Sequence, residues 1–170
     1  IRLFQPSIGK EELDNIKESF DNSWIGLGPK VNRFEEEWSK FIGCKHSVAV
    51  NSCTAALHLS LLAINIKRGD EVILPSMTFA ATANAIIHSG GIPIFADCKI
   101  GTMNIDPEDI LRKITKKTKA IIPVHFAGRP CDMDSIMMIA KKHKLKIIED
   151  CAHAIETKYK GKNAGTFGDI

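Results

Sequence analysis

The sequence predicts an α/β fold, with a mostly parallel sheet and flanking helices. Short apolar segments of strand type alternate along the chain with longer segments whose apolar residues recur at helical spacing. Glycine-containing turns separate them, such as Gly69-Asp70 and Gly90-Gly91, each followed by an apolar run. This alternation is typical of a parallel sheet that is buried between helices.

Two helices are expected first. Their apolar positions are Leu13, Ile16 and Phe20 in one, and Val31, Phe34, Trp38 and Phe41 in the other. A short apolar strand is expected at 47–50. Ser52 has the character of an N-cap for the helix that follows, which carries Leu57 and Leu61.

The remaining elements alternate strictly. Strands are expected at 72–74, 92–96, 120–124 and 146–149, helices from about Phe79 to Gly90 and over 132–144, and a hairpin within 157–163. Asp106-Pro107 supplies the N-cap and first residue of one further short helix. We therefore expect an N-terminal helical segment over 1–45 and an α/β core over 46–170. Because 166–170 has no closing element, we expect a fragment.

Composition excludes several classes of protein. With 44% hydrophobic residues and a net charge of +3, the chain is an ordinary globular protein and no nucleic-acid partner is expected. No run of 18 apolar residues occurs, so no membrane span is expected. Five cysteines without a Cys-x-x-Cys pair favour reduced thiols, a cytoplasmic protein and no structural zinc. The histidines show no metal-binding spacing, so no metal is expected.

Ligands of open α/β sheets bind beyond the carboxyl ends of the strands, and four features lie there, including the neighbours Cys151 and His153. The first is the helix start after Asn51, where small and hydroxylic residues offer free N–H groups to a phosphate; a plain Ser52 N-cap is the alternative. The second is Asp150, an acid at a strand end that could bind a metal, orient a histidine, hold a protonated ring nitrogen, or cap a helix. The third is Phe79, which could lie on a planar ligand or belong to the core.

A phosphate-binding helix start, a flat aromatic ring and a carboxylate together match pyridoxal 5'-phosphate. That cofactor needs its ring nitrogen protonated, and a carboxylate next to the nitrogen favours the protonated form. A nucleophilic Cys151 paired with His153 is a further reading, but the two residues are sequence neighbours in an irregular segment, which disfavours it.

These residues resemble the DegT family of pyridoxal-phosphate-dependent sugar aminotransferases. The resemblance covers nearly the whole chain and rests on segments in the family's order: 24–29, 51–58, 69–73, 75–79, 123–125, 149–154 and 159–161. It implies the aspartate-aminotransferase (fold type I) large domain, here incomplete, and a homodimer. It also implies transfer of an amino group from glutamate to a nucleotide-linked keto-sugar for surface polysaccharides or glycosylated metabolites.

The resemblance also assigns residues. Thr54, with backbone N–H groups near Cys53 and Ala55, would hold the cofactor phosphate, and Phe79 would stack on the ring. Asp150 would pair with the ring nitrogen, and His153 would lie near the phenolic oxygen. Cys53 and Glu156 stand where many members have Gly; Glu156 could alter the cofactor's edge or mark a subfamily.

The family's Schiff-base lysine is expected just beyond Ile170, because Lys158, Lys160 and Lys162 have a solvated, hairpin-like context. We therefore expect these 170 residues alone to be inactive. An inactive fragment, or a dehydratase relative with histidine in place of the lysine, are the alternatives.

Overall fold

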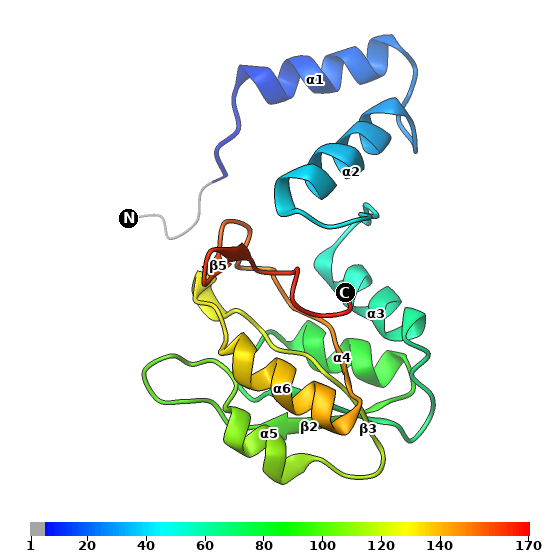
Figure 1. Cartoon of the computed structure of the whole chain (residues 1–170). Helices are drawn as coiled ribbons and strands as arrows, with labels where there is room; N and C mark the ends of the chain where they lie inside the picture. The colour runs from blue at the N-terminus through cyan, green and yellow to red at the C-terminus, as the bar shows by residue number, and fades with distance from the viewer. Residues whose placement is uncertain (1–5) are drawn as a thin grey trace. The chain divides into compact units, whose positions relative to one another are not determined.

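The computed structural model describes residues 6–170 and divides them into two compact units. One unit contains the chain up to Phe41 together with Lys45–Ala49; the other contains Ile42–Cys44 and Val50–Ile170. Figure 1 traces both from blue to red.

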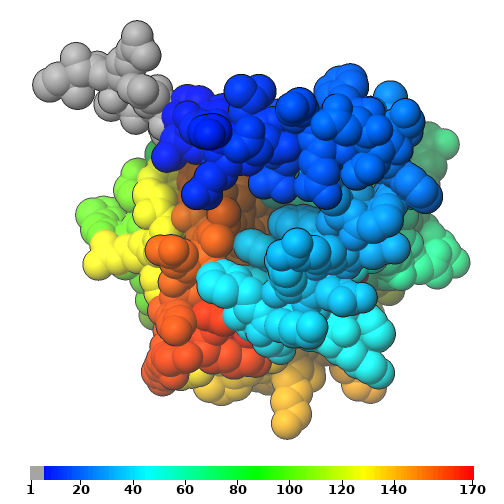
Figure 2. Space-filling view, turned by 90° about the horizontal axis from the view of Figure 1, so that it is seen from above, coloured from blue at the N-terminus to red at the C-terminus, as the bar shows by residue number. Residues whose placement is uncertain are grey.

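The first unit consists of two amphipathic helices, α1 (Lys10–Asp21) and most of α2 (Pro29–Ile42). Both helices lie where their apolar periodicity predicts. Neither buries a residue, and both contribute to the face seen in Figure 2 in shades of blue. Lys30 forms an ion pair of 2.9 Å with Glu18 and links the two helices.

The second unit is built on a four-stranded parallel sheet with the strand order β2-β1-β3-β4. The strands are β1 (Glu71–Pro75), β2 (Ile92–Ala96), β3 (Thr118–Ile121) and β4 (Lys146–Ile147). The predicted α/β class and mostly parallel sheet are therefore confirmed. Gly91 packs tightly, since a Cβ there would lie 3.0 Å from the Ile86 side chain.

Helices cover both faces of this sheet (Figure 1). Because side chains alternate along a strand, Val72 and Leu74 face one layer and Ile73 faces the other. The first layer holds α3 (Cys53–Ala63) and α4 (Ala80–His88), and the second holds α5 (Pro107–Lys113) and α6 (Met133–His143). The result is a three-layer sandwich in which every strand end on the carboxyl side leads into a loop or helix start.

The predicted helix caps are confirmed. Ser52 Oγ accepts a hydrogen bond from the Ala55 N–H at 3.1 Å, and the Asp106 carboxylate accepts one from the Glu108 N–H at 3.1 Å. Asp132 caps α6 in the same way, through the Ser135 N–H. The hairpin of β5 (Lys158–Tyr159) and β6 (Lys162–Asn163) turns at two residues with positive φ, Lys160 and Gly161, as a two-residue hairpin loop requires.

The strand expected at 47–50 is wrong. These residues have no regular secondary structure and pair with no strand in the described part of the chain, and Val48 is 79% exposed. The Ala49 N–H instead donates to the Glu35 carboxylate at 2.7 Å. An apolar run becomes a strand only where it pairs with a neighbouring strand, and no strand within residues 6–170 pairs with 47–50.

Two strands are shorter than expected, because β3 ends at Ile121 and β4 at Ile147. Pro123 has no N–H to donate, which interrupts the regular ladder there. Single hydrogen bonds nevertheless continue the pairing, with the Asp150 N–H donating to Pro123 O at 2.9 Å and the His125 N–H to Asp150 O at 3.2 Å. The chain beyond β4 thus stays aligned with the sheet as far as Asp150.

The last residues run beside β4. The Asp169 N–H donates to Ile147 O at 2.8 Å, and the Glu149 N–H donates to Ile170 O at 2.9 Å. Gly168 packs so closely here that a Cβ would lie 2.7 Å from Ile147 O. No helix among residues 6–170 is both long and apolar enough to cross a bilayer.

Candidate functional site

Asp150 lies at the carboxyl end of the sheet with its carboxylate anchored on both oxygens. Oδ2 accepts a hydrogen bond from the Thr82 hydroxyl at 3.0 Å, and Oδ1 accepts one from the Ala152 N–H at 3.2 Å. The residue is 5% exposed. A buried carboxylate is costly unless such donors compensate for lost water, so this one is held in a fixed orientation.

The start of α3 lies next to this carboxylate. Cys53 Sγ is 3.9 Å from Asp150 Oδ1, although 97 residues separate the two along the chain. Burial, together with the charge and the hydrogen bond of Asp150, raises the pKa of the Cys53 thiol. The thiol is therefore protonated at neutral pH and can act only as a weak donor to Asp150.

The first turn of α3 keeps donors available. The Ala55 N–H donates to Ser52 Oγ, so that group is used by the helix cap. The N–H groups of Cys53 and Thr54 carry no hydrogen bond to any residue in 6–170, as is usual for the first positions of a helix. With the Thr54 hydroxyl and the positive end of the helix dipole, they form a set of donors suited to an anion.

Phe79 is exposed at the same end of the sheet. It is the residue before α4, three positions from Thr82, and 78% of its surface is accessible. The interpretation of Phe79 as a core residue is therefore wrong. An exposed aromatic ring near a buried carboxylate is free to lie against a planar ligand.

His153 is exposed in the loop after Asp150 and lines a shallow, open hollow. The hollow has a volume of about 620 Å³ and is bordered by Gly128, Ala152, His153, Ile155, Glu156 and Thr157. The His153 ring meets Phe126 edge-on, with 6.1 Å between the ring centroids. Glu156 thus borders the same hollow as His153.

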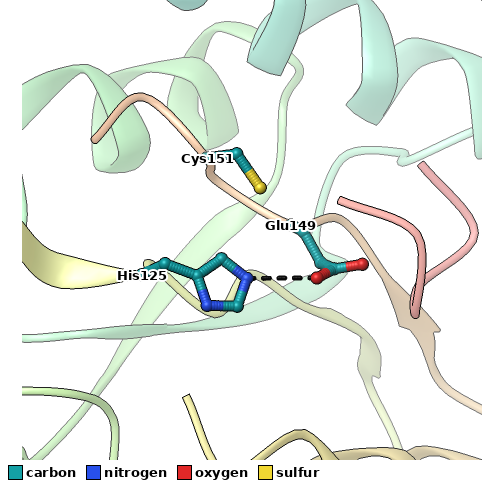
Figure 3. A group of neighbouring side chains, drawn as sticks. All are labelled: His125, Glu149 and Cys151. Carbon is teal, nitrogen blue, oxygen red and sulfur yellow. Dashed lines mark hydrogen bonds and ion pairs between the residues drawn. The ribbon is translucent and has the colours of Figure 1, made fainter. Parts of the chain in front are cut away.

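A second polar cluster consists of His125, Glu149 and Cys151 (Figure 3). The Cys131 N–H donates to His125 Nδ1 at 3.0 Å, so Nδ1 carries no proton and the hydrogen is on Nε2. Nε2 then donates to Glu149 Oε2 at 3.0 Å. His125 is accordingly neutral, and its contact with Glu149 is a hydrogen bond rather than an ion pair.

Glu149 accepts four hydrogen bonds. Besides His125, its donors are the backbone N–H groups of Gly165, Phe167 and Gly168, at 2.9, 2.6 and 2.8 Å. Burial alone would raise the pKa of the Glu149 carboxyl, but these donors together hold it below its usual value. An ionised Glu149 therefore ties the segment 165–168 to the end of β4.

The three ligand atoms of this cluster lie within 4.8 Å of one another, yet their chemistry does not suit a metal. Both ring nitrogens of His125 and both oxygens of Glu149 are already engaged. Burial and the charges of Glu149 and Asp150 raise the pKa of Cys151, so its thiol is not ionised. The same shift removes the nucleophilic Cys151 considered from the sequence.

No lysine of the described chain is placed for covalent chemistry. Every lysine within residues 6–170 is exposed. Lys160 is paired with Asp134, and Lys162 donates to Thr166 O at 2.6 Å. The hairpin lysines thus have the solvated surroundings expected from the sequence.

The structure brings Cys53 and Asp150 together and places Phe79 and Thr82 at the adjoining start of α4, while His153 lies in the next loop. The sequence did not predict Thr82, nor the hydrogen bonds by which Glu149 joins His125 to the segment 165–168. Thr82 carries no local signal, because its partner is 68 residues away. The donor set, with a free helix start, an exposed ring and a buried carboxylate, fits a ligand that carries an anionic group and a basic aromatic nitrogen.

Known proteins are similar to this chain in sequence and in fold. A spore coat polysaccharide biosynthesis protein of Bacillus subtilis is 51% identical over 164 residues, which are 96% of this chain and 42% of that protein. GDP-perosamine synthase of Escherichia coli O157:H7 is 45% identical over 171 residues, which cover 100% of this chain and 47% of that protein. The chain thus spans less than half the length of these relatives.

Solved structures agree. The aminotransferase from Psychrobacter cryohalolentis superimposes with a TM-score of 0.94 at 39% identity, over 96% of this chain and 42% of that one. Two further matches are described as a PLP form and as bound to the cofactor PMP, which supports the cofactor predicted from the sequence. Residues 6–170 match the model of the DegT/DnrJ/EryC1/StrS aminotransferase family, and the chain belongs to that family.

Proposed function

We propose that this chain is the cofactor-binding part of a sugar aminotransferase. The whole protein would transfer an amino group from glutamate to a nucleotide-linked keto-sugar with pyridoxal phosphate as cofactor, leaving 2-oxoglutarate. The observation that carries the proposal is the buried Asp150 carboxylate, held by Thr82 and Ala152 beside the free N–H groups of α3. GDP-perosamine synthase, which is 45% identical, by its name makes a nucleotide-linked sugar, and this supports the substrate class.

Each residue of the site has a distinct task in this proposal. Thr54 and the N–H groups of Cys53 and Thr54 bind the phosphate, which the start of α3 attracts electrostatically. Phe79 covers one face of the ring. Asp150 holds a proton on the ring nitrogen, and His153 donates to or accepts from the phenolic oxygen.

Protonation of the ring nitrogen is what makes Asp150 important. When bound, the cofactor supplies an electron-withdrawing ring that stabilises the charge left when a carbon next to nitrogen loses its proton. Asp150 increases that withdrawal by keeping the nitrogen positively charged. Because Thr82 and Ala152 fix the carboxylate before binding, no reorganisation is needed at the time of reaction.

The lysine that binds the cofactor covalently is assigned to the part of the whole protein that follows this chain. The exposure of every lysine in 6–170 supports this assignment, since such a lysine needs a lowered pKa that exposure does not provide. These 170 residues alone are therefore proposed not to catalyse transamination. Residues 46–170 are proposed as the core of the cofactor-binding domain.

A homodimer in the cytoplasm completes the proposal. Apolar side chains on the first two helices are more than half exposed, and burying them against a second copy would stabilise an assembly: Leu13, Ile16, Phe20, Phe34 and Phe41. Cys53, Cys98, Cys131 and Cys151 form no disulfide, in keeping with a reducing compartment. Sedimentation of the whole protein at low salt would give a monomer if the dimer is wrong.

The test of the reaction uses the whole protein loaded with pyridoxal phosphate. It is given a GDP-linked keto-sugar and glutamate, and 2-oxoglutarate and the amino-sugar are measured together. Equal amounts of both products support the proposal. A deoxygenated sugar without glutamate consumption would instead indicate the dehydratase alternative, and no product with a range of nucleotide-linked keto-sugars would refute an enzymatic role.

A further inference from the structure

Thr82 reaches Asp150 from a different element and is itself hidden from solvent. It is the third residue of α4 and only 1% exposed, and its hydroxyl lies 3.0 Å from Asp150 Oδ2. The other side chain near the carboxylate, Cys53, offers only a weak thiol donor at 3.9 Å. Thr82 is therefore the strongest side-chain donor to Asp150 within the described residues.

A second threonine fixes the direction of this hydrogen bond. Thr78 Oγ1 lies 2.8 Å from Thr82 Oγ1. A hydroxyl has one hydrogen, and Thr82 must give it to Asp150 because an ionised carboxylate only accepts. Thr78 therefore donates to Thr82, and the two hydroxyls form a directed chain from Thr78 through Thr82 to Asp150.

We propose that Thr82 is a positioning residue for Asp150, and that its hydroxyl orients the Asp150 carboxylate toward the basic ring nitrogen of the cofactor and favours the proton on that nitrogen. This inference rests on the proposed function, in which Asp150 is the partner of that nitrogen. Nothing in the sequence or in the names of the relatives assigns a role to Thr82.

Thr82 acts on the position of the proton between Asp150 and the ring nitrogen. Between a carboxylate and a ring nitrogen, the proton can lie on the nitrogen as an ion pair or on the oxygen as a neutral pair. A donor to the carboxylate stabilises its ionised form and so favours the proton on nitrogen. Donation from Thr78 to Thr82 polarises the Thr82 hydroxyl and strengthens this effect.

Three variants of the whole protein separate positioning from packing. Thr82→Val removes the hydroxyl and keeps the branched shape, whereas Thr82→Ser keeps the hydroxyl and removes a methyl group. The control is Thr118→Val. Thr118 is also buried, at 5% exposed, and hydrogen-bonded through its hydroxyl, but it lies at the amino end of β3.

Two measurements are made on each variant: the dissociation constant of pyridoxal phosphate, and the nitrogen-15 chemical shift of the ring nitrogen of the labelled, bound cofactor. In Thr82→Val we expect the dissociation constant to rise about tenfold, as the loss of one charge-assisted hydrogen bond implies. The ring-nitrogen signal should move toward the unprotonated value. Thr82→Ser should stay close to wild type in both, and Thr118→Val should not move the nitrogen signal.

An unchanged nitrogen signal in Thr82→Val would overturn the inference. If that variant does not fold, Thr78→Val decides instead: a smaller shift in the same direction supports the chain of hydroxyls, and no shift refutes it. Asp150→Asn is measured alongside. If Asp150→Asn leaves the nitrogen signal unchanged, the proposed role of Asp150 fails; if it moves the signal and Thr82→Val does not, only the role of Thr82 fails.

Discussion

Replacing Glu149 with glutamine should destabilise the protein strongly, although the two side chains have nearly the same shape. Each carboxylate oxygen of Glu149 accepts two hydrogen bonds, one oxygen from Phe167 and Gly168 and the other from His125 and Gly165. A glutamine keeps one oxygen and places an NH₂ group against the other two donors. Two of the four hydrogen bonds are lost whichever way the amide is turned.

The magnitude follows from that count. A hydrogen bond to a charged group contributes about 1.5–3 kcal/mol, so the loss of two gives about 3–6 kcal/mol. This is a large part of the roughly 5–15 kcal/mol by which a domain is stable. The matched control is Glu108→Gln, since Glu108 is exposed on α5 and its change should stay within about 0.5 kcal/mol.

The assay is urea unfolding followed by circular dichroism. Tryptophan fluorescence would be a poor probe, because Trp24 and Trp38 both lie in the first unit and Glu149 lies in the second. If Glu149→Gln loses no more stability than Glu108→Gln, the four-donor description of Glu149 is incorrect.

The pH dependence gives an independent check. The donors hold the pKa of Glu149 below its ordinary value of 4.5, so its contribution is fully present above that value and is lost as pH falls through the lowered pKa. Wild-type protein should therefore lose stability in acid more steeply than Glu149→Gln. Parallel curves for the two proteins between pH 7 and pH 3 would contradict this assignment.

Three more predictions concern single residues. Asp150→Asn in the whole enzyme should fold but lower kcat by about 10²–10⁴-fold, because a neutral amide no longer holds the ring nitrogen protonated; steady-state kinetics measures this, and an unchanged kcat would refute the role. Phe79→Ala should change the free energy of unfolding by less than about 0.5 kcal/mol, because Phe79 is exposed, and yet weaken cofactor binding in a titration. Gly168→Ala should cost about 1–3 kcal/mol in urea unfolding, because its methyl group would meet Ile147 O at 2.7 Å; full stability would show that the terminal segment yields.

Local patterns predicted most of the fold. The strand β2 was expected at its observed bounds because Gly90-Gly91 ends the preceding helix and an apolar run follows. The expected strand at 47–50 failed because a strand also needs a partner edge, and no local pattern reports whether one is present. Secondary structure was thus predictable wherever the sequence contained both the element and its boundaries.

Some residues of the candidate site could be predicted from the sequence, and others could not. Asp150 and the start of α3 could be found because each directly follows a strand or begins a helix, and parallel strands bring such positions to one edge. Thr82 could not be found, since a threonine inside a helix looks like any other until the partner 68 residues away is in place. The proton position on His125 likewise depends on a backbone N–H six residues ahead, which only the folded loop places at Nδ1.

The donors to Glu149 bear on how the protein is made. Glu149 belongs to the end of the sheet, but three of its four donors come from residues 165–168, which a ribosome synthesises later. A nascent chain that ends before Gly165 would have to bury this carboxylate with His125 as its one remaining donor, and that is strongly unfavourable. Docking of β4 during translation should therefore wait until residue 168 has left the exit tunnel, so that the edge carrying Asp150 closes only after residues 165–168 are available.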